Sequence, residues 1–71
     1  MGYEIKSPLP GSIWEIKVSE GQEIKEDEVV IILEAMKMEI PVVAPQDGTI
    51  ASIDVAVGDS VENGDTLASM N

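Results

Sequence analysis

The sequence predicts an all-β fold, a flattened sandwich of two four-stranded antiparallel sheets. Two observations predict it: an internal repeat whose copies alternate apolar and polar residues, and a run of β-branched residues in the middle of the chain. Alternation with a period of two is typical of half-buried strands, which cover their apolar face with a second layer. A chain of 71 residues supports one core, so we expect a single domain over residues 1–71.

The repeat appears when the chain is shifted by 37 positions, which lays residues 7–34 over residues 44–71 without a gap. The identical pairs are Pro8 with Pro45, Gly11 with Gly48, Ile13 with Ile50, Ile16 with Ile53, Val18 with Val55, and Gly21 with Gly58. Each copy reads as a proline, a turn, a glycine, a strand, a second glycine and two further short strands. Two copies of one unit predict two halves related by a pseudo-twofold axis.

The first strand of each copy carries the alternation. In the first copy we expect residues 12, 14, 16 and 18 to share one face, with Glu15 and Lys17 on the other, and residues 49–55 repeat this pattern. Ile13 and Ile50 break it, which predicts a bulge or bend at these two positions.

The turns of the two copies differ in sequence. Asn63-Gly64 predicts a tight hairpin turn, because both residues tolerate a positive φ. Glu26-Asp27 stands at the equivalent place in the first copy, where aspartate is a poorer but acceptable left-handed residue. We therefore expect the turn of the first copy to be the looser one.

The expected core is aliphatic. Its members are Ile16, Val18, Ile24, Val30, Ile32, Val43, Ile53, Val55, Val61 and Leu67. The aromatic residues are Tyr3 and Trp14. Since Trp14 has a repeat mate as small as Ala51, we expect it to cover an edge of the core, with stacking on a ligand as the alternative.

The centre of the chain, residues 29–43, is ambiguous by propensity alone. Residues 34–39 are all good helix formers, whereas the residues on both sides are β-branched and no N-cap precedes a sustained apolar stripe. If both copies are built from strands, their link is a hairpin, and its tip lies near Ala35 to Met38. The scaffold would then hold Lys37 out in solvent.

Composition excludes several classes of function. Four basic residues against 14 acidic ones give a net charge of −10, the wrong sign for binding a nucleic acid backbone. With no cysteine and no histidine, the usual zinc ligand sets are missing and we expect no metal site. The longest apolar run, Val29 to Leu33, is too short to span a bilayer, and the first residues lack the regions of a signal peptide. We expect a cytoplasmic protein without membrane insertion.

The segment Glu-Ala-Met-Lys-Met-Glu at residues 34–39 resembles the attachment motif of the biotinyl, or biotin carboxyl carrier, domains of the biotinyl/lipoyl attachment domain family. Similar domains carry Pro-x-x-Gly before the first strand, here Pro8 to Gly11, and Ala-Pro-x-x-Gly after the hairpin, here residues 44–48. The resemblance covers residues 5–70. It departs from the family at Asp27, where glycine is frequent, and the chain lacks the insertion that some acetyl-CoA carboxylase carriers have between Val18 and Gly21.

The resemblance implies the fold called a hybrid barrel-sandwich and a biotin covalently bound to Lys37. It implies three kinds of partner: a biotin protein ligase that uses ATP to make biotinyl-adenylate, a biotin carboxylase, and a carboxyltransferase or decarboxylase. The chain would be a carboxyl carrier for an acyl-CoA or oxo-acid carboxylase, decarboxylase or transcarboxylase. It would catalyse neither step itself.

The residues beside Lys37 suit partner recognition. We expect the ligase and the other partners to contact Glu34, Ala35, Met36, Met38 and Glu39. Alternation would place both methionines opposite the lysine, where flexible thioethers give apolar contacts that adapt to several partners. The alternatives are that the methionines belong to the core and that Lys37 is an ordinary solvated lysine.

An ordinary lysine is neutral, and so nucleophilic, in only roughly one molecule in a few thousand at pH 7. The sequence supplies no base to activate it, and it offers no convincing nucleophile with a base for catalysis. Two other functions remain open. One is a lipoyl carrier for oxo-acid dehydrogenases, whose motif usually reads Asp-Lys-Ala, and the other is an unmodified structural adaptor of the same fold.

Overall fold

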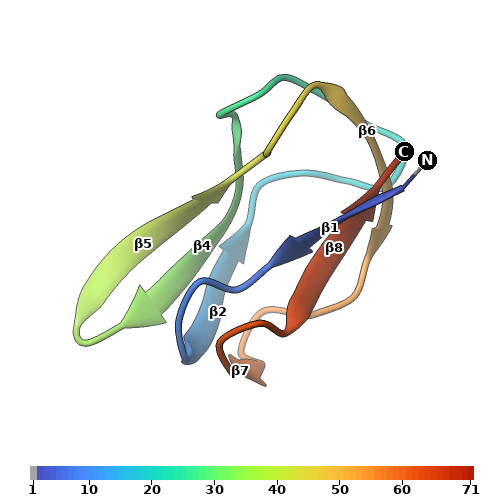
Figure 1. Cartoon of the computed structure of the whole chain (residues 1–71). Helices are drawn as coiled ribbons and strands as arrows, with labels where there is room; N and C mark the ends of the chain where they lie inside the picture. Colours follow the sequence, from blue (N-terminus) through green and yellow to red (C-terminus); the bar gives the residue numbers. More distant parts are fainter. Residues whose placement is uncertain (1) are drawn as a thin grey trace.

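The computed structural model describes residues 2–71, which form eight strands (Figure 1). The strands are β1 (Tyr3–Lys6), β2 (Gly11–Ile16), β3 (Glu23–Ile24), β4 (Val29–Ala35), β5 (Met38–Val43), β6 (Gly48–Ile53), β7 (Ser60–Val61) and β8 (Thr66–Met70). The central helix formers therefore lie in strands and a turn. Residues 2–71 contain no helix long and apolar enough to cross a membrane.

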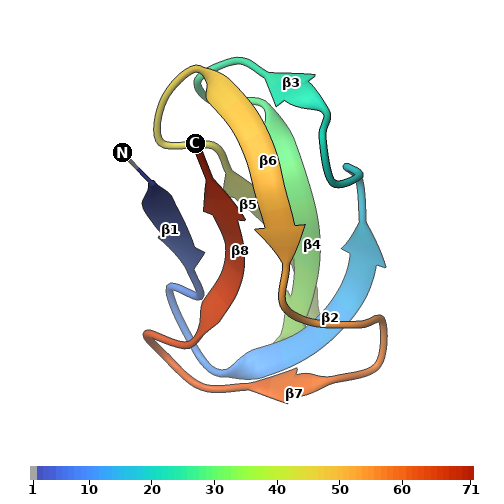
Figure 2. The same ribbon diagram turned by 90° about the vertical axis from the view of Figure 1, so that its right-hand side faces the viewer.

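The strands form two four-stranded sheets, and every pairing is antiparallel. One sheet has the order β1-β8-β6-β3 and the other β5-β4-β2-β7. Figure 2 shows β8 and β6 in front of β4 and β2, so the two sheets form two layers. The predicted all-β fold of two four-stranded antiparallel sheets is confirmed.

Hydrogen bonds between the two halves repeat with the same shift as the sequence. The Ser7 amide donates to the Asp65 carbonyl at 2.9 Å, and 37 positions away the Ala44 amide donates to the Glu28 carbonyl, also at 2.9 Å. Backbone bonds of this kind depend little on side chains, so the two copies keep one geometry although most of their residues differ. The predicted pseudo-twofold relation is confirmed.

The predicted bulges are present in both copies. The register of β2 shifts between Ile13 and Glu15, and that of β6 shifts between Ile50 and Ser52. Each isoleucine is buried, and the next residue is the extra one in its strand. The extra residue in β2 is Trp14, which is 51% exposed, so the prediction that it shares a face with residues 16 and 18 is wrong.

The core is aliphatic, as predicted, but its membership differs in part. Five predicted members are buried: Val18, Ile24, Val30, Val61 and Leu67. Three others pack at its margin: Ile16, Ile53 and Val55. Ile32 is a wrong prediction, because its neighbours Ile31 and Leu33 point inward and leave it half-buried on the outer face of β4. Val43 is a wrong prediction, because it is 39% exposed and its neighbour Val42 points inward instead. Large buried side chains that the prediction missed are Ile5, Ile13, Ile31, Leu33, Ile50 and Met70.

The expected difference between the two turns is not observed. The Glu28 amide donates to the Lys25 carbonyl at 3.0 Å, and the Asp65 amide donates to the Glu62 carbonyl at 3.1 Å. Asp27 has φ 69° and takes the place of Gly64 with φ 89°, so aspartate accepts the left-handed conformation here. The Asn63-Gly64 turn is also not a hairpin, because it connects β7 and β8, which belong to different sheets.

Candidate functional site

The candidate site is the hairpin that joins β4 to β5. Its ladder continues to the pair Ala35 and Met38, which leaves Met36 and Lys37 as a two-residue loop. These two residues have φ 54° and 63°, and two positive φ values in a two-residue loop define a type I′ turn. The hairpin predicted near Ala35 to Met38 is confirmed.

The turn type explains why Lys37 projects from the end of the strands. A type I′ turn matches the right-handed twist of its strands, so the two strands stay paired up to the loop. Asn-Gly is the usual sequence of such a turn, because other residues are strained at positive φ. Methionine and lysine do not favour a positive φ. The sequence could therefore locate this turn but could not predict its conformation.

The base of the hairpin packs closely against β2. A Cβ atom on Gly11 would lie 2.6 Å from the backbone oxygen of Glu34 and 3.2 Å from the Cβ of Ala35, and Ala35 is only 6% exposed. Any larger residue at position 11 would push β4 away from β2. Sequence reasoning placed Gly11 in the repeat and in the family motif, but it did not assign this positioning role.

The side chains at the tip lie in solvent. Met36 is 87% and Met38 63% exposed, and Glu34, Lys37 and Glu39 are exposed as well. The alternative in which the methionines belong to the core is therefore wrong. The predicted strand alternation also fails at Met36, because the strand ends at Ala35 and Met36 lies in the turn itself.

Charges near the tip are acidic apart from Lys37. Glu34 and Glu39 are directly paired across the β4–β5 ladder. Within residues 2–71 the ion pair that forms joins Lys17 Nζ to Glu15 Oε2 at 3.2 Å, and it leaves Lys37 without a carboxylate partner. The Lys37 amine is therefore free to meet another molecule.

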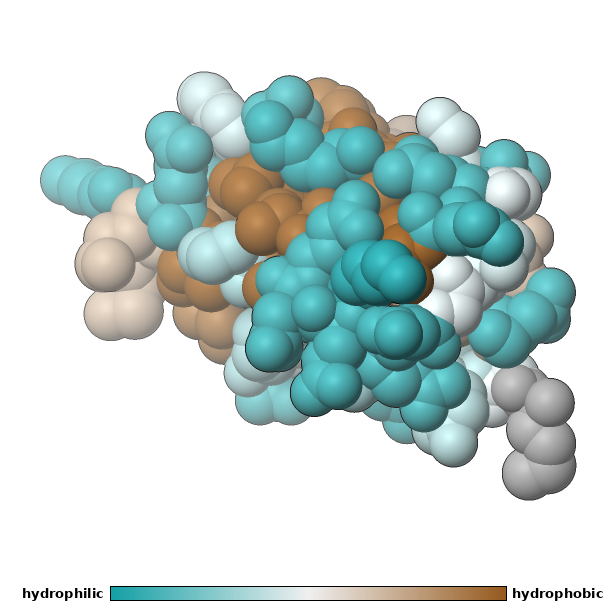
Figure 3. Space-filling model, turned by 90° about the horizontal axis from the view of Figure 1, so that it is seen from above, coloured by the Kyte–Doolittle hydropathy of each residue, from teal (hydrophilic) through white to brown (hydrophobic). Residues whose placement is uncertain are grey.

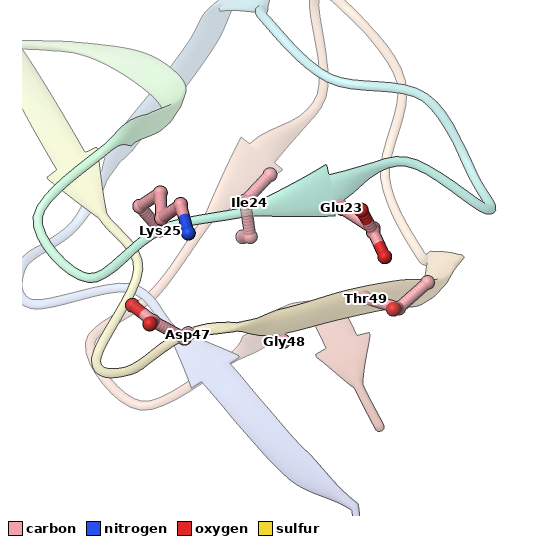
Figure 4. A pocket seen from close by; sticks show the side chains of 6 residues that line it. All are labelled: Glu23, Ile24, Lys25, Asp47, Gly48 and Thr49. Carbon is pink, nitrogen blue, oxygen red and sulfur yellow. The ribbon is translucent and has the colours of Figure 1, made fainter.

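An open hollow of about 340 Å³ lies apart from the tip, between β3 and β6 (Figure 4). It is lined by Glu23, Ile24, Lys25, Asp47, Gly48 and Thr49. Asp47 already accepts a hydrogen bond from the Glu26 amide at 2.8 Å. None of residues 34–39, which form the attachment motif, lines this hollow, so the exposed hairpin is the better candidate site.

The tip lies at the opposite end of the molecule from the chain ends. In Figure 1 the β4–β5 loop is at the lower left, and the ends of the chain meet at the upper right. Seen from above (Figure 3), much of the apolar surface, in brown, lies toward the hairpin end at the left, with polar side chains around it. Fold and site together define a small two-sheet β-domain that presents one exposed lysine on a tight loop.

Comparisons with known proteins give the family. A family model described as “Biotin-requiring enzyme” matches residues 3–70. The “Biotinylated protein TB7.3 homolog” of Mycobacterium leprae is 40% identical over 68 residues, which are 96% of each chain. The “Biotin/lipoyl attachment protein” of Bacillus subtilis is 38% identical over 63 residues, 89% of this chain and 86% of the relative. The chain belongs to the biotin/lipoyl attachment domain family, as its Ala-Met-Lys-Met segment predicted.

Solved structures agree with this assignment. The urea carboxylase of Kluyveromyces lactis contains a part that superposes on the whole of this chain with a TM-score of 0.95 and 32% identity. This chain corresponds to only 6% of that protein. The likeness therefore concerns one domain of a much larger protein.

We expect Met36→Asn to stabilise the domain. Asparagine tolerates the left-handed conformation that methionine adopts here at a cost, so the free energy of unfolding should rise by about 0.5–1 kcal/mol in urea denaturation. The control is Met38→Asn two residues further on, at the start of β5, where φ is not positive. An equal gain in both variants would show that the turn conformation is not the cause.

Proposed function

We propose that this chain is a biotin carboxyl carrier domain and that biotin is bound covalently to Lys37. The observation that carries the proposal is an exposed lysine on a two-residue loop, between two exposed methionines, in a chain of the biotin/lipoyl attachment family. Residues 1–71 act as one domain in this proposal, and the domain is not itself a catalyst.

The residues present at the tip fit such a group. The Lys37 side chain is exposed and free of carboxylate partners within residues 2–71, so its amine can be acylated without displacing another contact. A biotin protein ligase joins this amine to the carboxyl group of biotin through an amide bond, and ATP is cleaved to AMP and pyrophosphate. Bound biotin would supply a ring nitrogen that accepts and releases a carboxyl group.

The tip itself holds Lys37 out and offers contact surface. The paired strands keep the loop at a fixed distance from the core, and Met36 and Met38 add flexible apolar contacts for several enzymes in turn. The partners that we propose are the ligase, a biotin carboxylase, and a carboxyltransferase or decarboxylase. Because the modification consumes ATP, we place the protein in the cytoplasm.

A lipoyl carrier is the second candidate. Its support is the relative in Bacillus subtilis whose description includes both biotin and lipoyl attachment, and which aligns with 89% of this chain. The methionines on both sides of Lys37 favour biotin, because they match the biotinyl motif and not the Asp-Lys-Ala of most lipoyl domains.

Intact mass measurement separates these functions. The purified chain is incubated with a biotin protein ligase, biotin and ATP, and in parallel with a lipoate ligase, lipoate and ATP. We expect one biotinyl adduct per chain, located on Lys37 by sequencing the modified peptide, and no lipoyl adduct. A lipoyl adduct alone would support the second candidate, and an unmodified mass in both reactions would overturn the proposal in favour of an unmodified adaptor.

A further inference from the structure

The outward face of the sheet β5-β4-β2-β7 carries four apolar residues, Trp14, Ile32, Pro41 and Val43, which we call the outer patch. Ile32 is paired with Pro41 on β5 and with Glu15 on β2. Pro41, Ile32 and Glu15 therefore form one row across three strands. Trp14 is the extra residue of the bulge beside Glu15. Trp14 is 51% and Val43 39% exposed, and Pro41 is exposed as well.

The pseudo-twofold relation supplies an internal control for this surface. The positions equivalent to the outer patch on the other sheet are Ala51, Ser69, Glu4 and Lys6. The backbone pairing is the same there, since Glu4 pairs with Ser69 as Pro41 pairs with Ile32. The fold therefore does not need apolar residues at these positions, which makes the outer patch a candidate contact surface.

The outer patch belongs to the same two strands as the attachment hairpin. Ile32 lies on β4, and Pro41 and Val43 lie on β5, which also carry Ala35 and Met38 at the base of the loop. Carboxylates border the patch: Glu34 and Glu39 lie between the patch and the loop, and Glu15 lies beside Ile32, where its Oε2 is paired with Lys17 Nζ at 3.2 Å. A protein that covers Lys37 from this side would meet an apolar surface with an acidic rim.

We propose that the outer patch is the docking surface of the biotin protein ligase that acylates Lys37. The inference rests on the proposed function and names one partner of that site. A ligase must bring its reactive carbon into bonding contact with Nζ, and a lysine side chain is short, so the ligase surface has to close over the loop and the adjoining sheet face. Enzymes that act later reach the tip through the added length of the prosthetic group and need less of this contact.

The surface also indicates the chemistry of its partner. An exposed indole with neighbouring proline and valine suits an apolar depression, and aromatic anchors of this kind often carry much of the binding energy of an interface. Glu34 and Glu39, which have no ion-pair partner within residues 2–71, suit basic side chains around that depression, and so does the net charge of −10. Two copies of this chain would repel each other, which disfavours self-association through the patch.

The test is the steady-state kinetics of Lys37 biotinylation by a purified biotin protein ligase with ATP and biotin, at varied carrier concentration. We expect Trp14→Ala to lower kcat/KM about tenfold, mainly through KM, because the acceptor amine is unchanged. Trp14→Glu should lower it further. The matched control is Tyr3→Ala, which removes an aromatic residue 48% exposed on the other sheet and should leave kcat/KM within about twofold.

The outcomes separate this inference from the proposed function. If Lys37 is modified at the wild-type rate in both Trp14 variants, the docking surface is wrong while the carrier function stands. If Tyr3→Ala slows the reaction as much as Trp14→Ala, the effect is not specific to the outer patch and the inference is overturned. Thermal unfolding of each variant is measured alongside, and Ala51→Trp, which builds an indole at the equivalent place, should not change the kinetics.

Discussion

Lys37→Arg is expected to abolish covalent biotin incorporation. Arginine keeps the positive charge and much of the length of lysine, but its guanidinium stays protonated at any ordinary pH and does not form the amide bond. We expect streptavidin capture of the variant from cells with active ligase to fall to background. The fold should be unaffected, because the exposed side chain changes only beyond its apolar stem.

Lys25→Arg is the matched control. Lys25 is also exposed and also lies next to a turn, but it follows β3 and lies outside the β4–β5 hairpin. Streptavidin should capture the Lys25→Arg variant as strongly as the wild type. Unchanged capture of the Lys37 variant would show that another amine carries the group, and the proposed function would then lose its site.

Leu33→Ala is expected to bring the domain close to unfolding. Leu33 is fully buried, and removal of such a side chain costs about 2–5 kcal/mol through lost burial and the cavity left behind. A chain of this size has a total stability of roughly 4–10 kcal/mol, so the loss is a large part of it. Urea denaturation followed by tryptophan fluorescence measures the change.

Val57→Ala provides the control for this prediction. Val57 is 63% exposed, so its truncation should change the free energy of unfolding by less than about 0.5 kcal/mol.

Met70 is the repeat mate of Leu33 and is equally buried, so Met70→Ala should lower the free energy of unfolding about as much as Leu33→Ala. A loss below about 1 kcal/mol for Leu33→Ala would contradict the burial of this strand.

The architecture and the place of the candidate lysine could be predicted because they depend on the repeat. Two matching copies require a link between them, and the β-branched residues on both sides of residues 34–39 outweigh the helix propensity of those six residues. The link therefore had to be a hairpin, and Lys37 is at its tip. The motif around it then led to the family.

Which side chains point inward could not be predicted fully, because a shift of one residue in register moves the next residues to the other face. β4 and β5 have such a shift between Val29 and Ile31, and as a result both Val30 and Ile31 are buried while Val43 is left on the outer surface. The bulge at Trp14 has the same effect in β2. Alternation alone does not reveal these irregularities.

The pairing of Tyr3 with Met70 brings the first and last strands together at the end of the molecule away from Lys37. A bead, a dye or a fused protein joined at Asn71 would therefore lie at the end of the molecule opposite Lys37. It would not block an enzyme that approaches the Lys37 amine. Tethering this chain by its tail to a sensor surface should leave it fully competent as an acceptor.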